Sequence, residues 1–387
     1  MIRQSKLILL LGVFIISLTS CNGDQKTSGL FPTWKQRNEA WQDSIQFQHS
    51  LDLKKEVKNF VTADAETIPV IAGVDDDAAD DPAWFTVKDD SVRFIIAASN
   101  KVAGIHLYEV NGDSTGFYNV GRINNIDART VKTGENDSLT VLAGSNRDQN
   151  SILIIAPPVK NGNKEPVTTN IPTTLDDVYG FCLYHSHISG NLYAFVNSKS
   201  GEIEQYLLDI DTNYVIGFPV RKLAVRSQPE GMVADDRTGV LYVGEEKGGI
   251  HIFDAEPEGN HSSSLIKGSD QSNSFIHYDI EGLALYKTGE SGGYLIASSQ
   301  GNFSFAVFDL TTQLYITSFR IEGSDPDSVE ETDGIEIIDT YVSLEYPEGI
   351  LIVQDGFNTS QGKPEAQNFK IIDWRQIRSL LTASSGV

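Results

Sequence analysis

The chain has 387 residues, of which 40% are hydrophobic and 21% are charged, and its 30 basic and 53 acidic side chains give a formal net charge of −23. This much apolar sequence predicts a packed core and excludes a disordered chain. The negative charge argues against nucleic acid or an anionic membrane surface as the main partner, because their phosphates would be repelled. An anionic ligand would therefore need cations between itself and the protein. The two cysteines, Cys21 and Cys182, are too few for a disulfide framework and fit no zinc site.

The N-terminus predicts export from the cytoplasm. Two basic residues precede an apolar run over residues 7–18, which is too short to span a bilayer as a mature helix. The run ends in Leu-Thr-Ser-Cys, which resembles a bacterial lipobox and predicts cleavage of residues 1–20 and lipidation of Cys21; the alternative is a plain secretory signal peptide. Asn22 favours the outer membrane or cell surface, with the periplasm left open. We interpret 21–59 as a polar tether with one short helix.

The rest of the chain, over residues 60–380, predicts an all-β fold, a six-bladed β-propeller. A short apolar strand that ends in a polar residue, followed by a second short strand, recurs six times. The last polar residues of the first strands are Asn100, Asn146, Ser198, Glu246, Gln300 and Asp355, which lie 46, 52, 48, 54 and 55 residues apart. A period of about 50 residues with at least two strands per unit is typical of propellers and not of helical solenoids.

A second position, upstream of the first in each unit, is acidic in five units of six. Its occupants are Asp81, Asp127, Tyr179, Glu230, Glu281 and Asp333. The innermost strands of a propeller line a central channel, so equivalent positions form a ring at one mouth. Carboxylates gathered there would repel one another unless cations bind, and oxygen ligands without His or Cys favour calcium. The alternative is that these acids only begin strands or solvate loops.

Basic residues follow the marker strands in the first half of the repeat. Lys101, Arg147 and Lys199 occupy this region in units one to three, whereas Glu246 and Asp355 occupy it in units four and six. A phosphate could be held by the cations on one flank and by bound calcium on the other. The alternative is a set of ordinary solvated turns. Motifs of serine hydrolases, P-loop enzymes and zincins are absent.

Many ordered segments from about Phe60 to Ile377 resemble the β-propeller phytases, also called alkaline phytases or 3-phytases. The segments that carry the resemblance are Asp80-Asp81-Pro82-Ala83, Ser145-Asn146-Arg147, Val178-Tyr179-Gly180-Phe181, Pro229-Glu230-Gly231-Met232, Asp279-Ile280-Glu281-Gly282-Leu283, Ser299-Gln300-Gly301-Asn302, Thr332-Asp333-Gly334-Ile335, Gln354-Asp355-Gly356 and Gln367-Asn368-Phe369-Lys370. The resemblance implies a propeller that binds several calcium ions, structural and catalytic, and hydrolyses phosphomonoesters of myo-inositol hexakisphosphate (phytate).

Family motifs also assign roles to single positions. The resemblance implies that phosphate is bound by Lys101, Arg147, Lys199 and Tyr179. It implies metal ligation by Glu66, Asp80, Asp81, Glu230, Glu246, Asp279, Glu281, Asp327, Asp333 and Asp355, and the repeat alignment adds Asp127. The catalytic set around the metal-activated water would be Glu230, Glu246, Asp279, Glu281 and Tyr179. The chain departs from the family pattern at Ser200, where an acid is usual, and at Val102, where a second lysine is usual.

The resulting hypothesis is a calcium-dependent phytase that acts as a monomer on calcium phytate and lower inositol phosphates, binds no nucleic acid, and meets a membrane only through its lipid anchor. Two other classes stay open. A propeller lactonase or other calcium-dependent hydrolase would share the fold but would not need the three basic residues. A non-catalytic surface lipoprotein would bind phytate without releasing phosphate.

Overall fold

The computed structural model describes residues 34–88, 91–132, 138–156, 167–210 and 214–384. The predicted signal peptide and Cys21 lie outside the described residues. The chain divides into two compact units, the second of which begins at Phe47 and holds all of the strands. Within the described residues, no helix is both long and apolar enough to cross a membrane.

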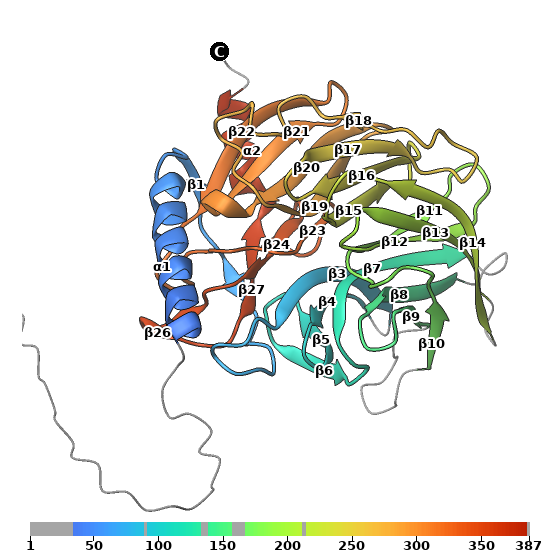
Figure 1. The fold of residues 1–387 in the computed structure, drawn as a ribbon, viewed down its shortest axis with the longest axis horizontal. Helices are drawn as coiled ribbons and strands as arrows, with labels where there is room; N and C mark the ends of the chain where they lie inside the picture. The colour runs from blue at the N-terminus through green and yellow to red at the C-terminus, as the bar shows by residue number, and fades with distance from the viewer. Residues whose placement is uncertain (1–33, 89–90, 133–137, 157–166, 211–213, 385–387) are drawn as a thin grey trace, which may run out of the picture. The chain divides into compact units, whose positions relative to one another are not determined.

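Six sheets follow one another around a ring, which confirms the predicted six-bladed propeller (Figure 1). In chain order the first three blades are β3 (Ala79–Lys88), β4 (Val92–Asn100), β5 (Gly104–Glu109) and β6 (Ser114–Tyr118); β7 (Ile123–Lys132), β8 (Ser138–Asn146), β9 (Ser151–Ile155) and β10 (Thr168–Pro172); and β11 (Phe181–His185), β12 (Leu192–Asn197), β13 (Glu202–Ile210) and β14 (Val215–Ala224). The next two are β15 (Pro229–Asp235), β16 (Val240–Glu245), β17 (Gly249–Asp254) and β18 (Ser264–Leu265); and β19 (Ile280–Thr288), β20 (Gly292–Ser299), β21 (Ser304–Asp309) and β22 (Leu314–Ile321).

The sixth blade joins the two ends of the propeller. It consists of β23 (Ile335–Ile338), β24 (Ile350–Asp355), β27 (Asn368–Asp373) and the early strand β2 (Ala65–Glu66). β2 pairs with β27 in the register Ala65 to Ile371, so backbone hydrogen bonds close the ring. β1 (Asn59–Val61) similarly adds a parallel fifth strand to the outer edge of the fifth blade. The smaller elements are the hairpin β25 (Thr359–Ser360) and β26 (Lys363–Pro364), the 3₁₀ turn η1 (Gln300–Asn302), and the helices α1 (Trp34–Lys54) and α2 (Trp374–Ser384).

Continuous apolar runs form the middle strands because each blade is covered on both faces by its neighbours. All five residues of β9 are buried, as are all six residues of β24. A strand covered on both faces has no polar alternation, which is why these runs look uninterrupted in the sequence. The core consists of apolar layers between successive blades, and the lone thiol of Cys182 lies in one of them, 1% exposed.

The propeller unit extends further toward the N-terminus than the expected boundary at residue 60. Its first residues are the last turns of α1, which is 21 residues long and so longer than the short helix expected in the tether. Lys54, 3% exposed, donates to the Val329 carbonyl at 3.0 Å and to Glu330 at 2.6 Å. The burial of a paired lysine cannot be recognised in the sequence, because lysine is usually exposed. The segment therefore looks like a polar tether.

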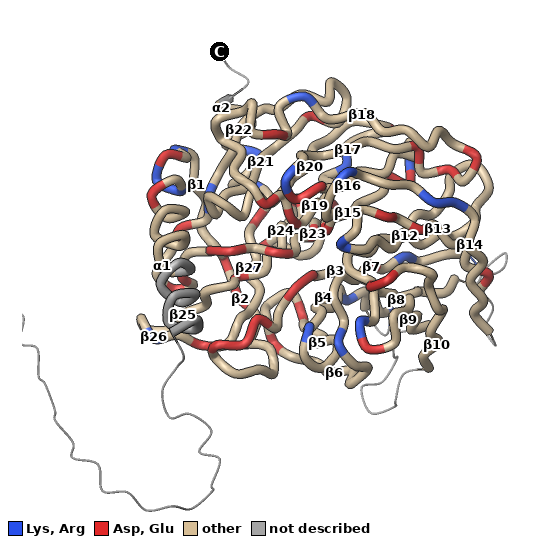
Figure 2. The backbone as a smooth tube through the Cα atoms, in the orientation of Figure 1, with Lys and Arg blue, Asp and Glu red and all other residues tan. Residues whose placement is uncertain are grey.

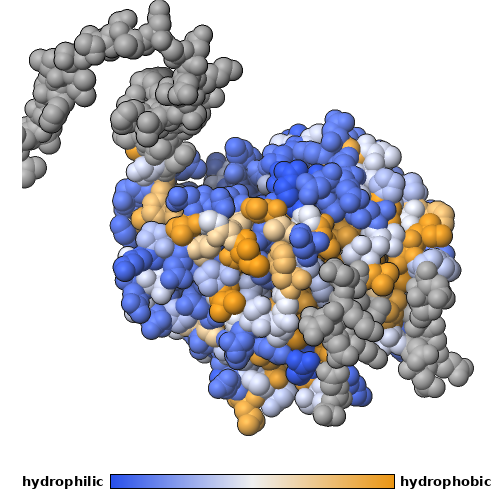
Figure 3. Space-filling model, turned by 90° about the horizontal axis from the view of Figure 1, so that it is seen from below, coloured by the Kyte–Doolittle hydropathy of each residue, from blue (hydrophilic) through white to orange (hydrophobic). Residues whose placement is uncertain are grey.

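Charged and apolar residues are unevenly placed on this unit. Acidic residues lie around the centre of the ring, on β3 and beside β19 and β24 (Figure 2). On the face shown in Figure 3, hydrophobic residues are interspersed with hydrophilic ones, which is usual because folded proteins keep many apolar atoms on their surface. The acidic centre is therefore the feature that requires a functional explanation.

Candidate active site

A cavity of about 1010 Å³ brings together seven of the predicted site residues. Of the predicted residues, those that line it are Lys101, Tyr179, Glu230, Glu246, Asp279, Glu281 and Asp333. Eleven acids line the cavity, and Lys101 is the one basic residue among its described lining residues. An anion could enter such a cavity only after the negative charge has been compensated.

Glycines allow the innermost strands to approach closely around this cavity. In four blades the cavity residue is followed by glycine, as in Glu230-Gly231 and Glu281-Gly282. A Cβ atom on Gly231 would lie 2.2 Å from the carbonyl oxygen of Glu281, and one on Gly282 would lie 2.6 Å from that of Asp333. Only glycine fits there, so the acidic residue of one blade lies directly beside that of the next.

Three buried carboxylates form the centre of the site. Glu230, Glu246 and Glu281 each place an oxygen within 4.8 Å of the other two, and their exposed fractions are 5%, 8% and 4%. Asp80 is fully buried, and neither of its carboxylate oxygens has a hydrogen-bond partner among the described residues; Oε2 of Glu281 has none either. Buried carboxylate oxygens without donors are what a hard metal ion requires, so this cluster could hold a metal.

The pKa values of this cluster reflect burial and mutual repulsion. Burial, together with the charges of Glu230 and Asp279, raises the pKa of Glu246 to about 7. Burial and neighbouring charges raise the pKa of Asp333 to about 6, and the same causes raise the pKa values of Asp80 and Glu281 well above their usual range. In the metal-free protein these groups therefore hold protons to a higher pH than ordinary carboxyl groups do, and a bound cation would have to displace those protons.

Neutral donors orient the carboxylates. The Tyr179 hydroxyl donates to Glu230 Oε2 at 2.6 Å, and Asn124 Nδ2 donates to Glu230 Oε1 at 2.9 Å. Gln300 Nε2 donates to Asp333 Oδ1 at 2.8 Å, and Gln228 Nε2 donates to Glu246. Glu230, Asp333 and Glu246 are thus each held by a donor that adds no charge to the site.

The three predicted basic residues are each linked to this site. Lys101 Nζ lies 2.7 Å from both Asp333 Oδ2 and Asp77 Oδ1. Burial alone would lower the pKa of Lys101, but Asp333, Asp80 and Asp77 outweigh it and raise the pKa. Arg147 Nη1 donates to Asn124 Oδ1 at 3.1 Å. Lys199 Nζ lies 4.3 Å from the centre of the Tyr179 ring. The structure therefore brings the phosphate-binding candidates of three blades together with the carboxylates.

The six equivalent positions expected from the repeat do not form one ring. Asp81 and Asp127 line a second cavity of about 380 Å³ with Arg129 and Glu336, while the other four line the large cavity. The inner strands of four blades carry a β-bulge at the same place, and this shared register makes Asp80 and Asn124, rather than Asp81 and Asp127, the counterparts of Glu230 and Glu281. The repeat alignment was thus wrong by one residue in the first blade and by three in the second. It missed Asn124, which the pair Asn124-Asn125 at the strand start could have signalled.

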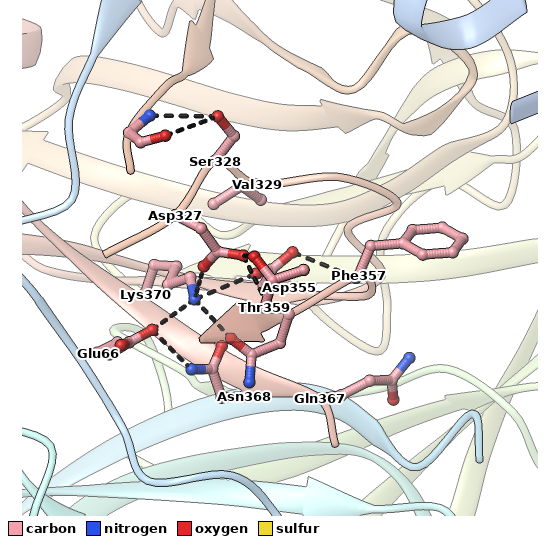
Figure 4. A network of polar contacts seen from close by, with 12 residues as sticks. Glu66, Asp327, Ser328, Val329, Asp355, Phe357, Thr359, Gln367, Asn368 and Lys370 are labelled. Atoms are coloured by element: carbon pink, nitrogen blue, oxygen red, sulfur yellow. Dashed lines mark hydrogen bonds and ion pairs between the residues drawn. The ribbon is translucent and has the colours of Figure 1, made fainter. Parts of the chain in front are cut away.

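Three predicted metal ligands form a separate cluster around a buried lysine. Lys370, whose side chain is 0% exposed, lies 2.5 Å from Glu66, 2.5 Å from Asp327 and 3.2 Å from Asp355 (Figure 4). Asn358 Oδ1 also accepts from Lys370 at 2.9 Å. Burial raises the pKa of Asp355 to about 7, although Lys370 acts against it. These carboxylates do not line the large cavity, so their role is distinct from that of the Glu230 cluster.

The two departures from the family pattern have simple surroundings. The Ser200 hydroxyl lies 2.6 Å from the Ser198 hydroxyl, and Val102 is 50% exposed. Neither position supplies a charge to the cavity.

The chain is similar to a known protein family and to a characterised relative. A phytase family model matches residues 42–387. The chain is 38% identical over 325 residues to a 3-phytase of Bacillus subtilis (strain 168), which covers 82% of this chain and 84% of that protein. Among solved structures, the β-propeller domain of Cps50 (Swd1) from Myceliophteria thermophila matches 76% of this chain and 82% of its own, with a TM-score of 0.45 and 11% identity.

Proposed function

Because the chain belongs to the phytase family, whose members hydrolyse phosphomonoesters of phytate, we propose that its carboxylate cluster holds calcium ions and that a water molecule in the cavity is the nucleophile. The observation that carries the proposal is the group of close oxygens on Glu230, Glu246 and Glu281, next to orphaned oxygens of Asp80 and linked to three basic side chains. Asp279 and Asp333, which line the same cavity, complete the proposed ligand set.

The chain's own residues account for phosphate binding. Lys101, Arg147 and Lys199 would bind the equatorial oxygens of the phosphate, and the Tyr179 hydroxyl would orient Glu230. Calcium in the cluster would supply positive charge for the phosphate and acidify water in the cavity. A covalent phospho-enzyme is not needed in this scheme.

The experiment that tests the proposal is phosphate release from phytate by the purified protein at about pH 7 to 8, with and without EGTA. Release that EGTA abolishes and added calcium restores is expected. Tight calcium-dependent binding of phytate without release would favour a capture protein instead. Full activity after exhaustive EGTA treatment would contradict the role of calcium.

Replacing Arg147 by glutamine is expected to lower kcat/KM for phytate by about 10- to 100-fold, since a charge-assisted hydrogen bond to phosphate is lost. The measurement is initial rates at saturating calcium. Arg122→Gln is the matched control, because Arg122 lies on the same blade and pairs with Asp148 at the surface. Equal rates for both variants would favour a hydrolase of uncharged esters or lactones.

Calcium affinity is expected to rise between about pH 5 and pH 8. The carboxylates of the metal-free site have raised pKa values, so they hold protons that calcium must displace at low pH. The sign for stability is opposite: because the folded state binds more protons than the unfolded chain, the metal-free protein should lose stability as the pH rises through these pKa values. Calorimetric calcium titrations at several pH values and in buffers of different ionisation heat check both proton release and affinity. An affinity independent of pH would count against ligation by these acids.

We further propose that Cys21 carries a lipid and anchors the enzyme, as a monomer, at the outer membrane or cell surface. The lipobox-like sequence before Cys21 supports the anchor. Cys21→Ser should release the protein from the membrane fraction and remove the mass of the acyl groups, as measured by mass spectrometry. A membrane-bound Cys21→Ser variant would refute the anchor.

A further inference from the structure

Outside the proposed calcium site, the lining of the large cavity includes apolar side chains among its polar ones. Phe47, Leu51, Val74 and Phe357 line the same cavity as Glu230 and its neighbours. We propose that Phe47, Leu51 and Phe357 are specificity-determining residues that contact the carbon ring of the leaving group. The inference rests on the proposed function, since it assigns a role to the part of the cavity that the phosphate does not need.

We call Phe47, Leu51 and Phe357 the apolar wall of the cavity. Its aromatic residues are held in place by packing between segments that are distant in the chain. The Phe47 ring centre lies 4.4 Å from that of Phe357 and 5.5 Å from that of Phe303. Phe303 is 5% exposed and provides a buried support, whereas Phe357 is 43% exposed. Phe357 follows the end of β24, and its backbone N–H donates to Asp355. An exposed aromatic ring held beside a reaction cavity is available to a ligand.

The helical part of the wall is fixed by Lys54. Residues 47, 51 and 54 lie four and three positions apart, so they share one face of α1. Lys54 at the end of this face bonds to Val329 and Glu330, and Glu330 itself lines the cavity. The buried lysine therefore holds Phe47 and Leu51 in place at the cavity.

The proposed substrate has both charged groups for the basic residues and a carbon ring for the apolar residues of the cavity. Phytate is a cyclohexane ring with phosphate groups around it, and its ring carbons carry C–H bonds that apolar side chains can cover favourably. A cavity of about 1010 Å³ is also large for one phosphate group. A small acyclic phosphomonoester bound through its phosphate at the basic residues would have no ring to place against Phe47 and Phe357. The wall should therefore discriminate between leaving groups.

The test compares phytate with glycerol 2-phosphate, using the purified full chain at saturating calcium. For Phe47→Ala, the ratio of kcat/KM for phytate to that for glycerol 2-phosphate is expected to fall about 10-fold, mainly through a higher KM for phytate. Phe47→Leu, which keeps an apolar side chain, should lie between the wild type and Phe47→Ala. Leu53→Ala is the matched control, because Leu53 lies on the same helix but does not line the cavity, and it should leave the ratio unchanged.

The possible outcomes separate this inference from the proposed function. If the wild type releases no phosphate from phytate, the proposed function fails and the inference fails with it. If the wild type is active and Phe47→Ala keeps the wild-type ratio, only the inference fails. An equal loss on both substrates would also overturn it, because the wall would then only support the site; melting temperatures show whether such a loss comes from unfolding.

Discussion

Replacing Glu230 by glutamine is expected to lower kcat for phosphate release from phytate by about 100- to 1000-fold, which corresponds to several kcal/mol of lost transition-state stabilisation. Glu230 lies at the centre of the site, where it accepts from Tyr179 and Asn124 and approaches Glu246 and Glu281. Glutamine keeps the size of the side chain but not its charge. The proposed calcium ions would lose a ligand that no neighbouring group can replace without rearrangement.

Initial rates at saturating phytate and calcium measure this effect, and calcium titrations show whether metal affinity falls with it. Glu290→Gln is the control, because Glu290 is exposed and does not line the large cavity. Thermal melting confirms that both variants are folded. A Glu230→Gln enzyme that keeps more than about a tenth of the wild-type kcat would show that the reaction does not depend on this carboxylate.

The second large effect concerns stability: Lys370→Met is expected to lower the free energy of unfolding by about 3–5 kcal/mol in the presence of EGTA. The variant leaves Glu66, Asp327 and Asp355 without the ammonium group that lies 2.5 to 3.2 Å from each of them. An uncompensated buried charge costs more than a lost surface contact. Because the three acids are also predicted metal ligands, added calcium should recover part of the loss.

The loss should depend on pH in a defined direction. Lys370 acts against the burial that raises the pKa of Asp355, so without Lys370 the pKa of Asp355 rises further and the folded variant holds a proton that the unfolded chain has released. Its stability then falls relative to the wild type as the pH rises from about 4 to 8. Urea unfolding across this range measures the difference. The control is Lys55→Met at the exposed pair with Asp52, which should change stability little; equal effects of the two substitutions would refute the role of Lys370.

The sequence was sufficient for the architecture. The markers Asn100, Asn146 and Asp355 end the second strands of their blades, and Ser198, Glu246 and Gln300 directly follow theirs. Strands can be predicted from local sequence, because a short continuous apolar run indicates a strand that is buried on both faces. The basic residues that follow these strands, Lys101, Arg147 and Lys199, could also be predicted from local sequence, and the structure places them at one site.

Only the tertiary structure showed how the predicted acids divide between the large cavity, the second cavity and the cluster around Lys370. The bulges that set the positions of Asp80 and Asn124 depend on pairing with the next strand. Lys370 meets Glu66 across 304 positions of the chain, because β2 closes the ring against β27. Phe47 lines the cavity because Lys54, on the same helix, is buried and paired with Glu330. In the sequence, Lys54 looks like part of a polar tether. Composition and spacing determine how many carboxylates and lysines are available, but their pairing depends on contacts between segments far apart in the chain, which local patterns do not encode.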